Sequence, residues 1–243
     1  MSRMSETEQL KPQQQLSGVL KSMVSVEEEA LLVGHLRFVL ALNQKVNLTG
    51  IDDEESGLLL HIEDSLAALQ EVNAAPEGRL VDLGSGGGFP GIPLAIMTGR
   101  KTTLIEATDK KARTLKKYLE SAGLDGQVDI IASRIEEASK SMMGCFAVAT
   151  ARALSSLAAI MELASPLLMD EGVLVAYKGN VTDVEMAGAR KVEDCLGMEL
   201  FSRRELLLSD GRTRREILVF MKKRPAKVSL PRRNGQAQRH PFG

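Results

Sequence analysis

The sequence predicts an α/β protein in which a mostly parallel sheet carries a C-terminal antiparallel hairpin and follows an N-terminal helical region. Short β-rich runs alternate with helix-length segments after residue 76, which is typical of parallel strands joined by crossover helices. The first 75 residues repeat apolar side chains at helical spacing instead. Near the end, the dipeptide Asp210-Gly211 joins two extended runs and indicates a hairpin.

The N-terminal part divides into two segments. Residues 1–15 are rich in Gln, Ser and Glu, and we expect them to be disordered. Residues 16–75 are expected to form a helical cap, with one helix over about 26–45 and a second over 52–69. The second segment opens with four acids, which favour a helix N-terminus.

The α/β domain is expected over residues 76–221, followed by a basic tail over 222–243. The pattern predicts parallel strands at 79–83, 101–107, 127–133, 145–151 and 172–178. Helices are predicted at 90–98, 109–123, 155–168 and 181–196, and the hairpin strands at 199–210 and 213–223.

The amino-acid composition disfavours several classes of protein. No run of about 18 apolar residues is present and the first residues are polar, so we expect a cytoplasmic protein. Cys145 and Cys195 lie far apart and there are three histidines, so neither a disulfide framework nor a metal site is expected. Residues 222–243 hold seven Lys or Arg and no acid. Such a tail attracts nucleic acid, although a merely solvated tail has the same composition.

The run "VDLGSGGGFPGIP" at 81–93 is the strongest local signal. It follows the first predicted strand and leads into a helix, where a nucleotide-type ligand lies in α/β sheets. Glu106 ends the second strand 22 positions after Gly84, close to the spacing of an acid that binds ribose hydroxyls. The alternatives are tight packing of strand against helix and an ordinary surface glutamate.

The ligand is expected to be S-adenosyl-L-methionine. A dinucleotide fingerprint starting at Gly84 needs glycine where Phe89 stands, which disfavours a nicotinamide-dependent oxidoreductase. Asp82 would repel a pyrophosphate but suits the ammonium and sulfonium groups of S-adenosylmethionine. No lysine follows the glycines as a P-loop requires.

Several blocks resemble the glucose-inhibited division protein B family: "NQKVNLTGI", "HIEDSL", "VDLGSGGGFPGIPLAI", "SRIEE", "ARALSSL", "AYKG" and the final "LPRRNGQAQRHPFG". The resemblance implies a class I methyltransferase (Rossmann-like) fold and S-adenosylmethionine-dependent methylation of guanine N7 in small-subunit (16S) ribosomal RNA. The implied partner is that RNA or its assembly particle.

By position, the resemblance implies that Gly84 and Phe89 line the methionine and adenosine site. Ile135 and Glu136 would flank the adenine, and Arg152 would complete the pocket. Together with the acids and glycines of the loop, the expected cofactor-binding set is Asp82, Gly84, Gly86, Phe89, Glu106, Ile135, Glu136 and Arg152. Glu106 stands where many members carry Asp.

Guanine N7 attacks through an in-plane lone pair, so no general base is required and no catalytic residue is assigned. The candidates for guanine and RNA contacts are Asn47, His61, Lys178, Arg232 and Arg233. His61 on an amphipathic helix and Asn47 before a turn can equally be local structural residues. A non-catalytic RNA-binding module that retains the cofactor fold is the alternative function.

Overall fold

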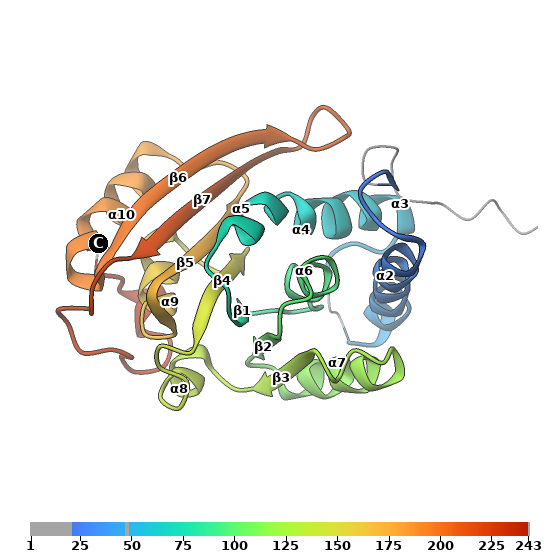
Figure 1. The fold of residues 1–243 in the computed structure, drawn as a ribbon, viewed down its shortest axis with the longest axis horizontal. Coiled ribbons are helices and arrows are strands. Elements are labelled where there is room, and N and C mark those ends of the chain that lie inside the picture. Colours follow the sequence, from blue (N-terminus) through green and yellow to red (C-terminus); the bar gives the residue numbers. More distant parts are fainter. Residues whose placement is uncertain (1–20, 47–48, 243) are drawn as a thin grey trace, which may run out of the picture.

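The computed structural model describes residues 21–46 and 49–242, and within them a single seven-stranded sheet runs in the order β3-β2-β1-β4-β5-β7-β6 (Figure 1). The first five strands pair in parallel, whereas β7 pairs antiparallel with β5 and β6. Their bounds are β1 Leu80–Leu83, β2 Thr102–Glu106, β3 Val128–Ala132, β4 Phe146–Arg152, β5 Leu168–Lys178, β6 Met198–Leu207 and β7 Arg214–Lys222. The mostly parallel sheet with a C-terminal hairpin is confirmed.

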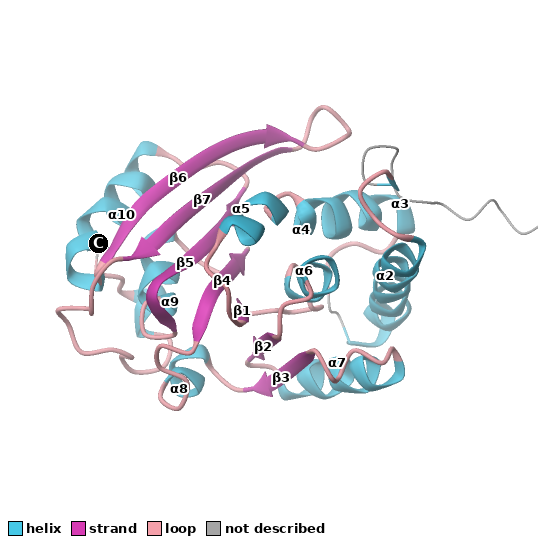
Figure 2. Ribbon diagram, viewed as in Figure 1, coloured by secondary structure: helices cyan, strands magenta, loops and turns pink. Residues whose placement is uncertain are grey.

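Helices cover both faces of the sheet (Figure 2). Val81 and Leu83 of β1 point to one face and Leu80 and Asp82 to the other, because successive strand residues alternate. The first face packs against α8 (Ile135–Ser139), α9 (Leu157–Ala164) and α10 (Asp183–Leu196). The second packs against α5 (Leu69–Ala74), α6 (Gly91–Thr98) and α7 (Asp109–Ser121).

The N-terminal helices pack on α6 and on the loop that precedes it. Leu32, Leu36 and Val39 of α2 (Val26–Val46) form a buried cluster with Ile62 and with Phe89 of the glycine-rich loop. The helical region before the sheet therefore contacts the loop directly. The expected disordered segment 1–15 lies outside the described residues.

The helix expected over 52–69 is present as an unbroken helical run from residue 54 to 66, but its middle is π-helical. The segment consists of α3 (Glu54–Gly57), a π-helix η1 (Leu58–Glu63) and α4 (Asp64–Leu66). The Ser65 hydroxyl donates a hydrogen bond to the His61 carbonyl at 2.5 Å. A π-turn leaves no mark on the apolar spacing, and such turns occur frequently at functional sites.

Two other elements also differ from expectation. The helix predicted at 155–168 ends at Ala164, because Pro166 has no backbone N–H to continue the helical hydrogen bonds, and β5 starts at Leu168. The short helix α8, Ile135–Ser139, was not predicted.

The carboxyl ends of the parallel strands lie together at one edge of the sheet. Leu83 of β1 is in register with Ile105 of β2 and with Ala151 of β4, and Arg152 is in register with Tyr177. The glycine-rich loop and the residues that end β2, β4 and β5 are therefore neighbours.

Candidate functional site

The glycine-rich loop leaves one stretch of backbone uncovered. Gly84, Gly86 and Gly88 all have positive φ, at +70°, +55° and +90°. A Cβ on Gly84 would lie 2.7 Å from Leu154 Cδ1, and one on Gly88 would lie 2.6 Å from Ile92 Cδ1. At Gly86 nothing lies nearer than a carbonyl oxygen at 4.0 Å. Packing therefore explains Gly84 and Gly88, whereas Gly86 presents open backbone to a ligand.

Glu106 lies beside that open backbone. The side chain ends β2 and is 7% exposed. Its Oε2 accepts a hydrogen bond from the Gly86 amide at 3.0 Å, and its Oε1 accepts one from the Thr108 amide at 2.7 Å. Because a carboxylate oxygen can accept more than one hydrogen bond, Glu106 keeps acceptor capacity for ribose hydroxyls. That role stays a prediction.

Asp82 lies beneath the loop and is 1% exposed. One carboxylate oxygen accepts the Gly91 amide at 3.1 Å and the other accepts the Thr150 hydroxyl at 2.7 Å. Burial raises the pKa of Asp82 to about 6. The structure thus places Asp82 where it ties β1, β4 and α6 together, and not as the open carboxylate that the sequence suggested. Its contact with a ligand stays a prediction.

Ser85 is a loop residue that the sequence reasoning missed. Among the described residues its hydroxyl is buried without a hydrogen-bond partner. A buried hydroxyl without a partner is costly unless a ligand or water satisfies it. Its position between Gly84 and Gly86 is the signal that could have identified it.

Phe89 faces the N-terminal helices. Its ring stacks on His61 with centroids 4.4 Å apart and packs against His35 at 4.3 Å. His35 Nε2 lies 2.8 Å from the Gly87 carbonyl and therefore donates to it, and burial lowers the pKa of His35 to about 3. Phe89 is 6% exposed, and its ring anchors the loop to α2 and η1. Its contact with the cofactor stays a prediction.

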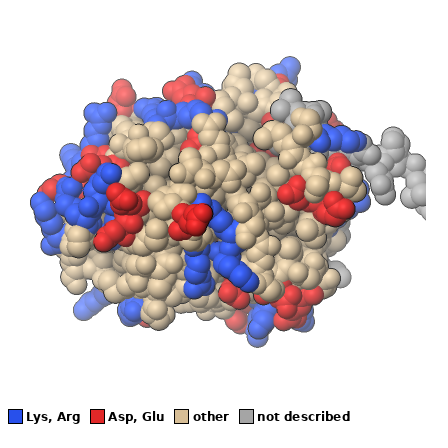
Figure 3. All heavy atoms as spheres, in the orientation of Figure 1, with Lys and Arg blue, Asp and Glu red and all other residues tan. Residues whose placement is uncertain are grey.

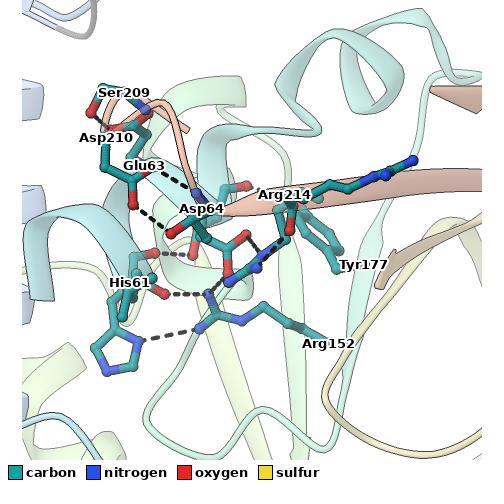
Figure 4. Close-up of polar contacts among 12 residues, drawn as sticks. His61, Glu63, Asp64, Arg152, Tyr177, Ser209, Asp210 and Arg214 are labelled. Carbon is teal, nitrogen blue, oxygen red and sulfur yellow. Dashed lines mark hydrogen bonds and ion pairs between the residues drawn. The ribbon is translucent and has the colours of Figure 1, made fainter. Parts of the chain in front are cut away.

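A cavity of about 450 Å³ opens beyond the ends of β4 and β5. At its base the buried Asp64 carboxylate accepts Arg152 Nη1 at 2.9 Å and Arg215 Nε at 2.7 Å. Figure 4 shows the Arg152 guanidinium directed toward Asp64 and His61. The lining residues are Ile51, Leu60, His61, Asp64, Arg152, Ala153, Tyr177, Lys178, Gly179 and Arg215. Arg152 lines this cavity together with Asp64 and Arg215, neither of which was among the expected site residues. The contact of Arg152 with the cofactor stays a prediction.

His61 joins this cavity as a neutral ring. Arg152 Nη2 approaches His61 Nδ1 at 3.4 Å, so the proton is on Nε2, which donates to the Thr49 hydroxyl at 2.7 Å. Burial, with Arg152 beside it, lowers the pKa of His61 to about 4. The ring therefore carries no charge for a phosphate at neutral pH.

The remaining candidates for RNA contacts do not form one group. Lys178 lines the cavity, forms an ion pair with Glu185 at 2.7 Å and donates to the Ser155 carbonyl at 3.1 Å. Asn47 lies outside the described residues. Arg232 and Arg233 lie in the C-terminal tail and do not line the cavity.

The tail is not the free arm that its composition suggested. Arg232 forms a two-fold ion pair with Glu162, and Arg224 pairs with Asp194 at 2.9 Å. On the face shown in Figure 3, Lys and Arg side chains at the α10 end of the molecule are interspersed with Asp and Glu. Acids contributed by distant elements neutralise these cations, and a count along the chain cannot show that. Arg233 is exposed and keeps its charge available.

Ile135 and Glu136 lie at the start of α8, directly after β3. They are 7% and 5% exposed. The Glu136 Oε1 atom accepts the Gly235 amide of the tail at 2.5 Å. Contact of these two residues with an adenine stays a prediction.

The described part of the chain contains neither a metal-binding cluster nor a membrane-spanning helix. Within residues 21–46 and 49–242 no group of His, Cys, Asp and Glu could hold a metal ion. Among the same residues no helix is long and apolar enough to cross a membrane.

The strand order, the glycine-rich loop after β1 and the acid that ends β2 define a Rossmann-like fold of the methyltransferase type. Solved structures share this fold. An O-methyltransferase from Bacillus cereus in complex with SAH has a TM-score of 0.56 at 16% identity, covering 84% of this chain and 100% of that one. A putative O-methyltransferase from Klebsiella pneumoniae has a TM-score of 0.53 at 13% identity, covering 85% and 94%.

The chain belongs to the rRNA small subunit methyltransferase G family (GidB), whose model matches residues 28–210. Proteins named ribosomal RNA small subunit methyltransferase G from Rubrobacter xylanophilus and Alkaliphilus oremlandii are 34% and 30% identical to it. The alignments cover 88% and 87% of this chain and 84% and 89% of those proteins. The resemblance read from the sequence blocks is confirmed, and the protein is a methyltransferase.

Proposed function

We propose that the protein transfers a methyl group from S-adenosylmethionine to N7 of a guanine in small-subunit (16S) ribosomal RNA. One observation carries the proposal. The open backbone of Gly86, with the Glu106 carboxylate beside it, follows β1, and the cavity of Arg152 and Lys178 opens at the same edge of the sheet, beyond the neighbouring strands β4 and β5. A cofactor and a nucleotide can therefore occupy adjacent positions.

The loop fits the proposed cofactor. Gly86 allows close approach of the methionine part, and the unpartnered Ser85 hydroxyl offers one hydrogen bond there. Glu106 is placed to accept hydrogen bonds from the ribose, and Ile135 and Glu136 lie farther along toward β3. When bound, S-adenosylmethionine supplies a methyl group made electrophilic by its sulfonium. An SAH complex of the Bacillus cereus O-methyltransferase, which shares the fold, supports this assignment.

The cavity fits a guanine nucleotide. Asp64 orients the guanidinium groups of Arg152 and Arg215, and planar guanidinium groups bind guanine oxygen or phosphate. Guanine N7 needs no proton removed before attack. This agrees with the neutral His61, whose two ring nitrogens already have protein partners. The protein's contribution is then alignment of the base with the methyl group and charge stabilisation.

The RNA partner is either free small-subunit rRNA or a ribosome-assembly particle, and the reaction takes place in the cytoplasm. The names of the family and of its relatives support the rRNA substrate. Outside the arginine pair, the exposed Arg233 is the candidate phosphate contact with the most available charge. The charges of Lys178 and Arg232 are already paired with Glu185 and Glu162, and their contact with RNA stays a prediction.

The test uses purified protein, S-adenosylmethionine labelled in its methyl group, and small-subunit rRNA or particles from cells that lack the protein. We expect label in one guanine of the RNA, and none with Gly86→Val. A protein that binds RNA but shows no heat of S-adenosylmethionine binding by titration calorimetry would instead be the non-catalytic RNA-binding module.

A further inference from the structure

The C-terminal segment, residues 231–242, is anchored to the sheet domain. Arg232 Nε and Nη2 donate to the two carboxylate oxygens of Glu162 at 2.6 and 2.5 Å, and Glu162 is 3% exposed. The Arg232 guanidinium also lies 3.9 Å from the centre of the Phe242 ring. Ala237, 1% exposed, joins the core beneath α9. Figure 1 shows the segment, in red, beside α9.

The same segment makes one hydrogen bond to a residue at the start of α8, after β3. Gly235 has a φ of +72° and donates its amide to Glu136 Oε1 at 2.5 Å. Glu136 is 5% exposed, and this bond crosses 99 positions of the sequence. A β-branched residue cannot adopt the left-handed backbone conformation of Gly235 without strain.

The strand order places Glu136 at the adenine end of the proposed cofactor. The methionine part lies at Gly86 after β1, and the ribose lies at Glu106, which ends β2. The next strand outward is β3, and its carboxyl end leads directly into Ile135 and Glu136. A ligand that extends from β1 past β2 therefore reaches Glu136 with its base.

A small cavity lies at this junction. It measures about 250 Å³ and is lined by Arg134, which precedes α8, and by Asn234, Gly235, Gln238 and Arg239 of the C-terminal segment. The segment thus forms part of the wall beside the start of α8, and does not extend away from the protein.

We propose that the C-terminal segment is a positioning element of the cofactor site: the Gly235 amide fixes the Glu136 carboxylate at the adenine end, and the Arg232–Glu162 pair holds the segment in place. The inference rests on the proposed binding of S-adenosylmethionine. Gly235 and Arg232 are positioning residues, because they act on the cofactor through Glu136. Loss of either leaves Glu136 without its partner and lowers the fraction of molecules that are ready to bind.

The first test compares two substitutions at Gly235 in the full chain. A Cβ there meets nothing closer than 3.5 Å, so space is not limiting and the backbone conformation decides. Gly235→Asn keeps the left-handed backbone and the amide, and its dissociation constant for S-adenosylhomocysteine, measured by titration calorimetry, should match that of the wild type. Gly235→Val should bind about tenfold more weakly, as it would if nine molecules in ten had the segment undocked.

The second test compares neighbouring arginines. Arg232→Ala leaves Glu162 buried without a partner and should also weaken S-adenosylhomocysteine binding by about tenfold. Arg233→Ala removes an exposed cation of the same segment and should leave that affinity unchanged. Circular dichroism at the titration temperature verifies that all four variants are folded.

The outcomes are separable. If the wild type binds S-adenosylhomocysteine and all four variants bind it equally, the positioning role is overturned while the proposed cofactor stands. Lower melting temperatures of Gly235→Val and Arg232→Ala with unchanged affinity overturn it too, since the segment would then be structural only. No binding by the wild type contradicts the proposed cofactor itself.

Discussion

Replacing Gly86 or Gly88 by alanine separates the two reasons for glycine in the loop. Both residues have positive φ, and a left-handed non-glycine residue costs about 1–2 kcal/mol. At Gly86 the new Cβ meets open space, so that cost is the whole effect on the free energy of unfolding. At Gly88 the Cβ would lie 2.6 Å from Ile92 Cδ1 and 3.0 Å from His35 Nε2. Overpacking adds about 1–3 kcal/mol, which brings the expected loss to about 2–5 kcal/mol.

The assay is urea unfolding of both variants, followed by calorimetric titration with S-adenosylhomocysteine. Gly86→Ala should be the more stable variant but the weaker binder. Its methyl group would occupy the space in which the ligand is proposed to contact the backbone of residue 86. Gly88→Ala should lose more stability and, at a temperature where it is folded, retain more affinity. The reverse order in binding would refute the assignment of Gly86 as the open position.

Two further predictions concern buried carboxylates. Asp64→Asn removes the negative charge that pairs with both Arg152 and Arg215, and should lower the free energy of unfolding by about 3 kcal/mol. This value is the low end for a broken buried ion pair, because both arginines are partly exposed. Urea denaturation measures the loss, and a loss under 1 kcal/mol would contradict the pairing. The pKa of Asp82 is about 6 in the folded state, above the ordinary 3.8. Between about pH 4 and 6 the folded protein therefore keeps a proton on Asp82 that the unfolded chain has lost, and the free energy of unfolding falls as the pH rises through this interval. Relative to Asp82→Asn, the wild type should lose up to about 3 kcal/mol over that interval, and parallel stability curves from pH 4 to 7 would refute the shift.

The strands and the glycine-rich loop could be predicted from the sequence because each has a local cause. Buried parallel strands are continuous apolar runs, and Gly84, Gly86 and Glu106 stand at fixed offsets from strand ends. The loop residues and Glu106 accordingly lie together as expected.

The directions of side chains and the pairing of charges could not be predicted. Phe89 points to α2 and η1 because residues of these two helices form a hydrophobic cluster into which its ring packs. The Asp64–Arg215 pair joins residues 151 positions apart, and Arg232 pairs with Glu162 across 70. Such pairings depend on the tertiary structure. From the composition alone, the tail cations were therefore predicted to contact RNA, and Asp64 was not among the expected site residues.

The proposed reaction is tested most directly by mass mapping of small-subunit rRNA from cells with and without this protein. We predict that one guanine carries a methyl group only when the protein is present, and that the methyl is on N7. Methylation at another atom or base, or identical RNA from the two cell types, would contradict it.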